Sequence, residues 1–262
     1  MAISRWGAAL NIEHSKNGST LTQALVLLPV LALLVTVLFA FSGDAKQQLQ
    51  AAACLNNMHQ WSLGFMMYAD DYKDYFPYGG DNFGVCDPAD NWAWYNIIPP
   101  YLGQRTLCDL YLSGTPPTPR MKGIWMCPSA TNLTVQPTDS NPFFMYAINV
   151  CTHQSGVTHN IFRRNRMTSP TNTFLFCEEP EDPFSEASGR YDTVTRHFGG
   201  SNFVFGDGHA DWLTFSDFCR QQNPGCRSVV QWNNSGISPT GDWNSSVRYH
   251  WWPFPGAATS SQ

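Results

Sequence analysis

Residues 17–41 read NGSTLTQALVLLPVLALLVTVLFAF, and the interpretation of the whole chain depends on this apolar run. From Ala24 to Phe41 it holds 18 residues without a charge, and Thr36 is the only polar side chain among them. A helix of that length rises about 27 Å, close to the roughly 30 Å hydrocarbon core of a bilayer. Since a cleaved secretion signal has only about 7–15 apolar residues, the run predicts a membrane-spanning helix. A cleaved signal and a simple anchor are the alternatives.

The segment that follows, residues 44–77, continues the helix with a different character. Its apolar residues return at intervals of four, three, four, three and four, which places them on one face of a helix. The polar residues Asn56 and Asn57 fall largely off that face. We expect one helix over about 20–72, apolar all round in its first half, amphipathic in its second, and ended by Pro77. A plain anchor followed by a separate helix is the alternative. The residues of the stripe are Cys54, Met58, Trp61, Phe65, Tyr68 and Tyr72.

Composition places the remainder of the chain in a soluble, loop-rich class. Of the 262 residues, 13% are charged and 14% are aromatic, and Gly and Pro recur throughout. The net charge is -5, and the 15 Lys and Arg residues form no extended basic run, which argues against nucleic acid as a partner. The eight cysteines contain no C-x-x-C pair, so a structural zinc site has little support. Their even number predicts disulfides outside the cytoplasm.

The C-terminal part of the chain predicts antiparallel strands packed on the second half of the long helix, which is an α+β fold. Three segments there are rich in aromatic and β-branched residues, the composition of strands. Residues 80–140 carry Pro, Gly and Trp with no period, and we expect ordered loops pinned by Cys86 and Cys108. The RRNR cluster at 163–166 is expected to form a solvated loop. The predicted strands are residues 143–150, 172–179 and 201–213.

The last of these segments is a predicted hairpin. Its Asp207–Gly208 pair favours a two-residue type I′ turn, which requires a positive φ at both residues. Because side chains alternate along a strand, we expect Phe203 and Phe205 on one face and Val204 on the other.

One group of polar residues near this hairpin invites a chemical interpretation. In an extended strand, Asp207, His209 and Asp211 would share one face, and a metal could bind their carboxylates and imidazole. Calcium would be favoured over zinc. We favour a structural role instead, with Asp207 as a turn residue and His197 hydrogen-bonded to the hairpin or to an acidic strand end. We expect no catalysis and no cofactor, because the sequence holds no G-x-S-x-G, H-E-x-x-H or phosphate loop. The group consists of His197, Asp207, His209 and Asp211, with Glu178 and Glu179.

Several segments together resemble one family. A leader that ends in Gly18, followed by STLTQALVLLP, resembles the prepilin peptidase site of type IV pilins and of type II secretion pseudopilins. CLNNMHQWSLGFMMYADDYKDYFP at 54–77 looks like the segment after the membrane helix in a large group of bacterial pilin-like proteins. MCPSA at 126–130 is similar to that group's Cys-Pro-Ser motif. RHFGGSNFVFGDGHADWL at 196–213 matches its processing-associated H-x9-D-G motif.

This resemblance implies a membrane-anchored filament subunit rather than an enzyme. Prepilin peptidase would cut between Gly18 and Ser19, and the mature chain would cross the bacterial inner membrane once, with its head in the periplasm. The implied partners are this peptidase, the inner membrane and other pilins or pseudopilins. The alternative is a membrane-anchored periplasmic module that binds or hydrolyses a glycan. The implied parts are a leader over 1–18, a transmembrane part over 19–42, an amphipathic helical part over 43–77 and a β-rich head over 78–262.

Two positions depart from the family pattern. Ser19 stands at the first mature position, where pilins usually have Phe or Met, and Gln23 at the fifth, where they usually have Glu. In the family that Glu pairs with the terminal ammonium of the neighbouring subunit, and a neutral amide offers only a weaker hydrogen bond. The resemblance therefore implies a minor or capping subunit.

The same resemblance implies one disulfide. Cys54 lies on the helical stripe, and Cys127 opens the Cys-Pro-Ser motif that accompanies this stripe in the family, so Cys54–Cys127 is the implied pair. Cys219 and Cys226 are a second candidate pair, because they are close in sequence with a Pro-Gly step between them.

Overall fold

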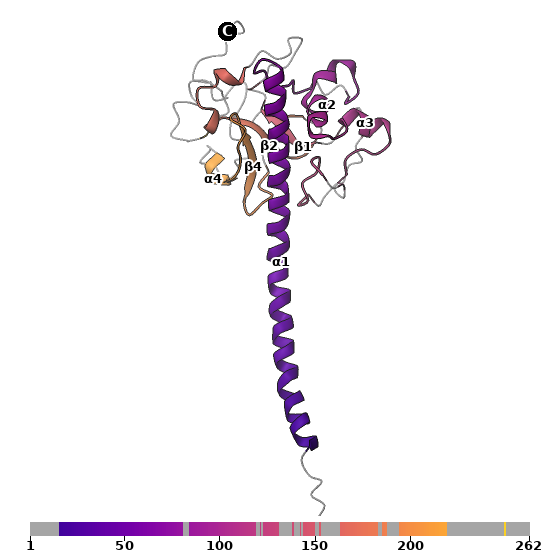
Figure 1. Ribbon diagram of the computed structural model, residues 1–262, viewed down its shortest axis with the longest axis vertical. Helices are drawn as coiled ribbons and strands as arrows, with labels where there is room; N and C mark the ends of the chain where they lie inside the picture. The colour runs from indigo at the N-terminus through magenta and orange to yellow at the C-terminus, as the bar shows by residue number, and fades with distance from the viewer. Residues whose placement is uncertain are drawn as a thin grey trace, which may run out of the picture. The chain divides into compact units, whose positions relative to one another are not determined.

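The computed structural model describes most of the chain between residues 16 and 218 (Figure 1). The chain divides into two compact units, Met1–Lys46 and Gln47–Gln262. Helix α1, Lys16–Asp71, contributes residues to both. The described residues are 16–80, 84–118, 121, 123–130, 138, 142, 144–149, 152, 163–182, 185–187, 194–218 and 249, without the side chains of 16–22, 34–42 and 180–182.

In the first unit, the described part of α1 exposes apolar side chains. Leu25 is 73% exposed and Leu33 is 66% exposed. Within the part of the chain that the structure describes, no helix is long and apolar enough to cross a bilayer. The predicted leader lies mostly outside the described residues, as do the side chain of Ser19 and those of 34–42 in the predicted transmembrane part.

In the second unit, α1 buries the predicted stripe up to Tyr68. Tyr72 is 42% exposed because the helix ends one residue before it, at Asp71. Asn57, predicted off the stripe, is also buried, and its amide donates to the backbone oxygens of Gly123 and Met126, both at 3.0 Å. A polar residue is tolerated on a buried face when its hydrogen bonds are supplied. The stripe residues with at most 1% exposure are Cys54, Met58, Trp61, Phe65 and Tyr68.

The C-terminal end of α1 is formed by two left-handed residues rather than by the proline that the sequence suggested. Lys73 and Asp74 have φ of 57° and 66°, and the Asp74 N–H donates to the Ala69 carbonyl over 2.8 Å. Arg164 Nη2 lies 2.7 Å from carboxylate oxygens of both Asp70 and Asp74. Arg164 therefore binds the end of α1, whereas Arg163, Asn165 and Arg166 are exposed, as predicted for a solvated cluster.

The residues after α1 form short helices where the sequence predicted loops. Two of these helices carry Pro at their start, where its fixed φ favours helix and its missing N–H costs nothing. A third follows Thr106, whose hydroxyl accepts the Asp109 N–H over 3.0 Å. The predicted pin between Cys86 and Cys108 is confirmed as a disulfide. The helices are η1 (Pro88–Trp92), α2 (Trp94–Ile97), η2 (Pro99–Leu102) and α3 (Leu107–Leu112).

The described strands form one sheet of five, in the order β3-β1-β2-β4-β5. Neighbours pair antiparallel except β1 and β3, which are parallel, so the sheet is mixed rather than wholly antiparallel as predicted. The predicted α+β class is confirmed. The strands are β1 (Phe144–Asn149), β2 (Phe174–Asp182), β3 (Glu186–Ala187), β4 (Gly200–Phe205) and β5 (Ala210–Thr214), with the short helices η4 (Arg164–Arg166), η5 (Pro170–Asn172) and α4 (Phe215–Phe218).

The two faces of the sheet bury different cores. Val204 belongs to the core that the second-unit part of α1 covers, where the rings of Phe65 and Phe176 lie 5.0 Å apart (Figure 1). Phe203 and Phe205 belong to a second cluster, on the other face. The predicted alternation along β4 is therefore confirmed.

The turn between β4 and β5 differs from the predicted type I′. Gly208 has a φ of 92°, whereas Asp207 is not at positive φ. The Gly208 N–H donates to the Phe205 carbonyl and the Phe205 N–H to the His209 carbonyl, both at 2.9 Å, so residues 206–208 form the loop. In such three-residue hairpins only the last loop position is left-handed. Asp207 acts through its carboxylate instead, which accepts the His209 N–H over 3.1 Å.

Candidate functional site

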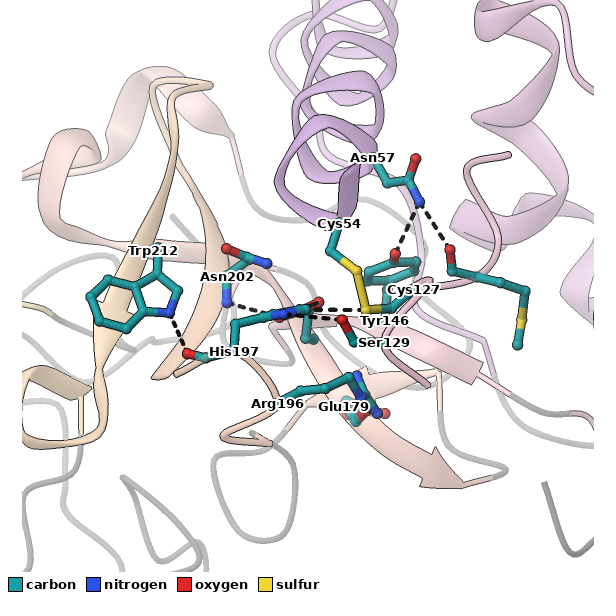
Figure 2. A network of polar contacts seen from close by, with 12 residues as sticks. Cys54, Asn57, Cys127, Ser129, Tyr146, Glu179, Arg196, His197, Asn202 and Trp212 are labelled. Atoms are coloured by element: carbon teal, nitrogen blue, oxygen red, sulfur yellow. Dashed lines mark hydrogen bonds and ion pairs between the residues drawn. A yellow bond between two sulfur atoms is a disulfide. The ribbon is translucent and has the colours of Figure 1, made fainter. Parts of the chain in front are cut away.

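Segments far apart in the sequence converge where the second-unit part of α1 meets the sheet (Figure 2). Helix α1 contributes Cys54, the segment 123–130 contributes Cys127 and β2 contributes Glu178. His197 comes from the turn just before β4. Each of these side chains is at most 2% exposed. We refer to Cys54, Cys127, Glu178 and His197 as the buried cluster.

Cys54 and Cys127 form a disulfide, which confirms the pair that the resemblance implied. Their Cα atoms lie 5.1 Å apart, inside the usual range of about 4.4–6.8 Å. The segment 123–130 is held against α1 independently, because the Trp61 indole N–H donates to the Ile124 carbonyl over 2.8 Å. The bridge therefore joins two backbones that other contacts already position. The other candidate pair, Cys219–Cys226, lies outside the described residues.

His197 is paired with Glu178 in the core. Its Nε2 lies 2.9 Å from Glu178 Oε1, and the two side chains are 1% and 0% exposed. The other carboxylate oxygen, Oε2, accepts the backbone N–H of Asn202 over 3.0 Å. A buried carboxylate requires such partners, because without them the loss of water is uncompensated.

The remaining contacts of His197 fix the direction of its ring (Figure 2). Nε2 lies 3.4 Å from Cys127 Sγ, and Nδ1 lies 3.5 Å from Ser129 Oγ. The Trp212 indole N–H donates to the His197 carbonyl over 2.8 Å. Nε2 therefore faces the disulfide and the carboxylate, while Nδ1 faces the serine.

The His-Phe-Gly-Gly sequence makes the turn that delivers this histidine. Phe198 and Gly199 have φ of 51° and 77°, and the His197 and Gly200 backbones exchange hydrogen bonds of 3.2 and 2.9 Å. A Cβ at Gly200 would lie 2.2 Å from the Leu213 carbonyl oxygen, so only glycine fits there. The two glycines thus allow a sharp turn directly against β5.

The residues predicted as metal candidates lie apart from the buried cluster. Asp207 is in the turn, Asp211 is in β5 opposite Phe203, and the His209 ring stacks on Phe205 at 4.2 Å between ring centroids. Asp207 Oδ1 lies 2.6 Å from His209 Nδ1, and Asp211 Oδ1 accepts the Trp212 N–H over 2.8 Å. The hairpin residues are therefore engaged with near neighbours.

A different set has the proximity of metal ligands. Among the described residues, the group of three or more His, Cys, Asp or Glu with converging ligand atoms is the buried cluster, whose ligand atoms all lie within 4.8 Å of one another. The sequence grouped His197 with Glu178 but did not include the cysteines. The sequence pointed to the cysteines only through the proposed Cys54–Cys127 pair. That pair does not indicate that His197, 70 residues after Cys127, would lie beside it.

Tyr146 and Asn57 border the cluster. The Asn57 amide donates to the Tyr146 hydroxyl over 3.4 Å. Burial, together with the negative charge of Glu178, raises the pKa of Tyr146 above its ordinary range. Figure 2 also shows Arg196 beside Glu179, and the Arg196 guanidinium donates to the Glu179 carbonyl over 3.0 Å. The surroundings are thus polar and largely buried, with Arg196 half-buried.

An apolar hollow of about 380 Å³ lies next to the His197 turn. Phe198, at its edge, is 59% exposed although it is a large apolar residue with a left-handed backbone. Such an exposed aromatic beside an apolar hollow is a feature of contact surfaces. The lining residues are Ala51, Ala52, Leu55, Phe198, Asn202 and Trp212.

Comparison with known proteins gives one match. Residues 45–173 match a family model described as "Protein of unknown function (DUF1559)". The matched range contains Cys54 and Cys127 and ends before Glu178 and His197. No curated protein and no solved structure matches the chain. The similarity therefore covers α1 from Ala45 to its end, the short helices η1, α2, η2, α3, η4 and η5, and β1, and carries no named activity.

Proposed function

We propose that this protein is a pilin-like bacterial surface protein, anchored in the inner membrane by the first part of α1, with its head in the periplasm. The observation that carries the proposal is the change of character within α1. In the first unit its apolar side chains are exposed, whereas in the second unit its apolar stripe is the centre of the core. The similarity over residues 45–173 is compatible with this assignment.

The exposed apolar side chains of the first unit are unfavourable in water unless lipid or another protein buries them. Each buried Leu contributes about 1.5–3 kcal/mol relative to an exposed one, so a row of exposed leucines in water is unfavourable. Lipid, or the matching helices of other subunits, would bury these side chains. The residues concerned include Leu25, Leu27, Leu28, Leu31 and Leu33, which are 60–73% exposed.

The two disulfides support an oxidising compartment for the second unit. Disulfides persist in the periplasm and are rare in the cytoplasm. Cys54–Cys127 and Cys86–Cys108 both lie in this unit. A cytoplasmic N-terminus and a periplasmic head would place the membrane between them.

The role proposed for the anchored protein is that of a minor or capping subunit of a type II secretion or type IV pilus-type filament. Prepilin peptidase would cut between Gly18 and Ser19. Gln23 is exposed on α1 and carries no charge to pair with the terminal ammonium of a neighbour. Exposed Phe198 and its hollow offer the head a second contact surface.

Carbonate extraction of membranes tests the anchor. The full-length chain should stay in the pellet, and Leu28→Arg with Leu31→Arg should move it to the supernatant, because each central Arg costs about 2.5–3.5 kcal/mol in a bilayer. Leu63→Arg is the matched control, since Leu63 is 57% exposed but belongs to the second unit. Release of the unchanged chain by carbonate would overturn the anchor.

Mass spectrometry of the mature N-terminus tests the processing. Cleavage before Ser19, lost in Gly18→Arg, is the expected result. A mature chain that begins at Gly43 would show a conventional signal and would refute the pilin-like assignment, whereas glycan binding or hydrolysis by a head that starts near Gly43 would favour the alternative. For the minor-subunit role, Gln23→Glu should increase incorporation along the filament, and long homopolymers of the unchanged protein in electron micrographs would contradict it.

A further inference from the structure

We propose that the buried cluster is a redox-dependent metal site. In the oxidised protein, Cys54 and Cys127 form the disulfide. In the reduced protein, their two thiolates, His197 Nε2 and a Glu178 oxygen would bind one divalent cation of the zinc class. The proposal rests on the convergence of these ligand atoms within 4.8 Å and does not depend on the filament role.

The geometry is close to that of a tetrahedral zinc site. With Zn–S of about 2.3 Å and Zn–N or Zn–O of about 2.0–2.1 Å, the ligand atoms of such a site lie about 3.5 Å apart for S and N and about 3.3 Å apart for N and O. Here His197 Nε2 lies 3.4 Å from Cys127 Sγ and 2.9 Å from Glu178 Oε1. For a cation to enter, the two sulfur atoms must separate to about 3.8 Å and the His197–Glu178 contact must widen to about 3.3 Å, while all the ligand atoms start within 4.8 Å of one another.

The outer contacts of the ligands are also those of a metal site. A metal-bound histidine usually donates its other ring N–H to an oxygen, and a bound carboxylate is itself hydrogen-bonded. With Nε2 as the ligand, the Nδ1–H would face Ser129 Oγ, 3.5 Å away. Glu178 Oε2 already accepts the Asn202 N–H over 3.0 Å, which leaves Oε1 directed at the cluster. The oxidised protein therefore holds both ligands in the orientation that a cation requires.

The donor set selects the chemical class of the cation. Two thiolates and an imidazole favour zinc over calcium or magnesium, which prefer oxygen ligands. Two thiolates and one carboxylate carry a charge of about -3, which a divalent cation reduces to about -1 inside a core that excludes water. Calcium, which the sequence suggested for the hairpin, does not suit this site.

The conversion between the two forms balances as a dithiol exchange. A reducing dithiol transfers two electrons to the Cys54–Cys127 bond, the S–S bond breaks, and the dithiol becomes a cyclic disulfide. The two protein thiols then lose two protons as the cation binds. Because both cysteines are fully buried, the reductant must reach them during local opening of the segment 123–130.

The Cys86–Cys108 disulfide provides a matched control within the same unit. Like the Cys54–Cys127 bridge, it joins two segments that the structure describes. Neither Cys86 nor Cys108 belongs to the group of converging metal ligands. Reduction of this pair should therefore create no cation site.

Cobalt spectroscopy of the full-length protein tests the site. The chain is reduced without oxygen by a phosphine, which is not a thiol ligand, and Co²⁺ is added as the probe. We expect a thiolate-to-cobalt charge-transfer band that saturates at one equivalent and is displaced by Zn²⁺ but not by Ca²⁺. The Cys86→Ser/Cys108→Ser variant should keep the band, and His197→Gln should weaken the cobalt affinity tenfold or more.

Two results would overturn the proposal. One is a reduced protein, folded by near-ultraviolet circular dichroism, that shows no such band. The other is a band that survives in the Cys54→Ser/Cys127→Ser variant, which would place the bound cobalt on other cysteines. If the reduced chain unfolds, the decisive measurement is the return of its near-ultraviolet signal on addition of Zn²⁺, and a chain that stays unfolded with excess Zn²⁺ also refutes the site.

Discussion

The two disulfides should differ in their contribution to stability, and the structure predicts which contributes more. We compare Cys54→Ala/Cys127→Ala with Cys86→Ala/Cys108→Ala, so that each variant loses one bridge and keeps the other. A bridge stabilises mainly by restricting the unfolded chain, and it does so more when it closes a longer loop. The sequence separations are 73 and 22 residues.

The loop lengths convert into a free-energy difference. The chain-entropy relation gives about 4.4 kcal/mol at 25 °C for a loop of 73 residues and about 3.4 kcal/mol for one of 22, a gap of about 1 kcal/mol. Packing acts in the same direction. Cys54 and Cys127 are fully buried, so their sulfur atoms leave a void, whereas Cys86 and Cys108 are half-buried. The gap of about 1 kcal/mol is therefore a lower bound.

Equilibrium unfolding of the full-length chain in guanidinium chloride measures both losses. The Cys54→Ala/Cys127→Ala variant should lose more free energy of unfolding than the Cys86→Ala/Cys108→Ala variant. Equal losses, or a larger loss for the shorter loop, would refute the reasoning from loop length and burial.

Three further substitutions test other parts of the structure. Gly208→Val should lower the free energy of unfolding by about 1–3 kcal/mol, because φ is 92° and a Cβ would lie 2.9 Å from Met66, and unchanged thermal unfolding would contradict this. Folding raises the pKa of Tyr146, so this group's contribution to stability is complete below pH 10 and declines above it. Between pH 8 and pH 11 the free energy of unfolding of Tyr146→Phe should therefore fall by about 1 kcal/mol less than that of the unchanged protein, measured by urea titration at both pH values. Glu178→Leu should lower the free energy of unfolding by about 3–5 kcal/mol, because it leaves His197 without its partner. Combined with His197→Leu, the loss should be smaller than the sum of the two single losses, and additive losses in the double-mutant cycle would disprove the pairing.

Local patterns in the sequence were sufficient for the long helix and for the faces of β4. The spacing of Cys54, Met58 and Trp61 reports the period of a helix, and the buried stripe follows it. The same pattern mislabelled Asn57, because a polar residue on a buried face depends on acceptors that come from the segment 123–130. Those acceptors are far away in the sequence and invisible to periodicity.

The turn shows a second limit of local patterns. An Asp-Gly pair fits both a two-residue and a three-residue hairpin, and the choice depends on residues that the pair does not contain. Here the Gly206 N–H donates to the Thr173 carbonyl over 2.9 Å, and a Cβ on Gly206 would collide with Met167 Sδ at 2.0 Å. A close approach of another segment thus selects the three-residue loop. Similarly, the sequence proposed Glu178 as a neighbour of His197, but only the packing of α1 and the segment 123–130 against the sheet shows that the cysteines belong to the same site.

The buried histidine–glutamate pair contributes more to specifying the fold than to its stability. Taking two ionisable groups out of water is costly, and their mutual interaction often does no more than offset that cost. The pair is satisfied, however, only in one register of β4. Asn202 in β4 lies opposite Trp212 in β5. The Asn202 backbone N–H donates to Glu178, and the Trp212 indole N–H donates to the His197 carbonyl. A slip of one residue would remove the Asn202 N–H from a buried carboxylate, at about 1–3 kcal/mol or more, and would also turn the aromatic face of β4 away from its core. The buried pair therefore penalises the wrong registers of the same strand that carries the aromatic core residues.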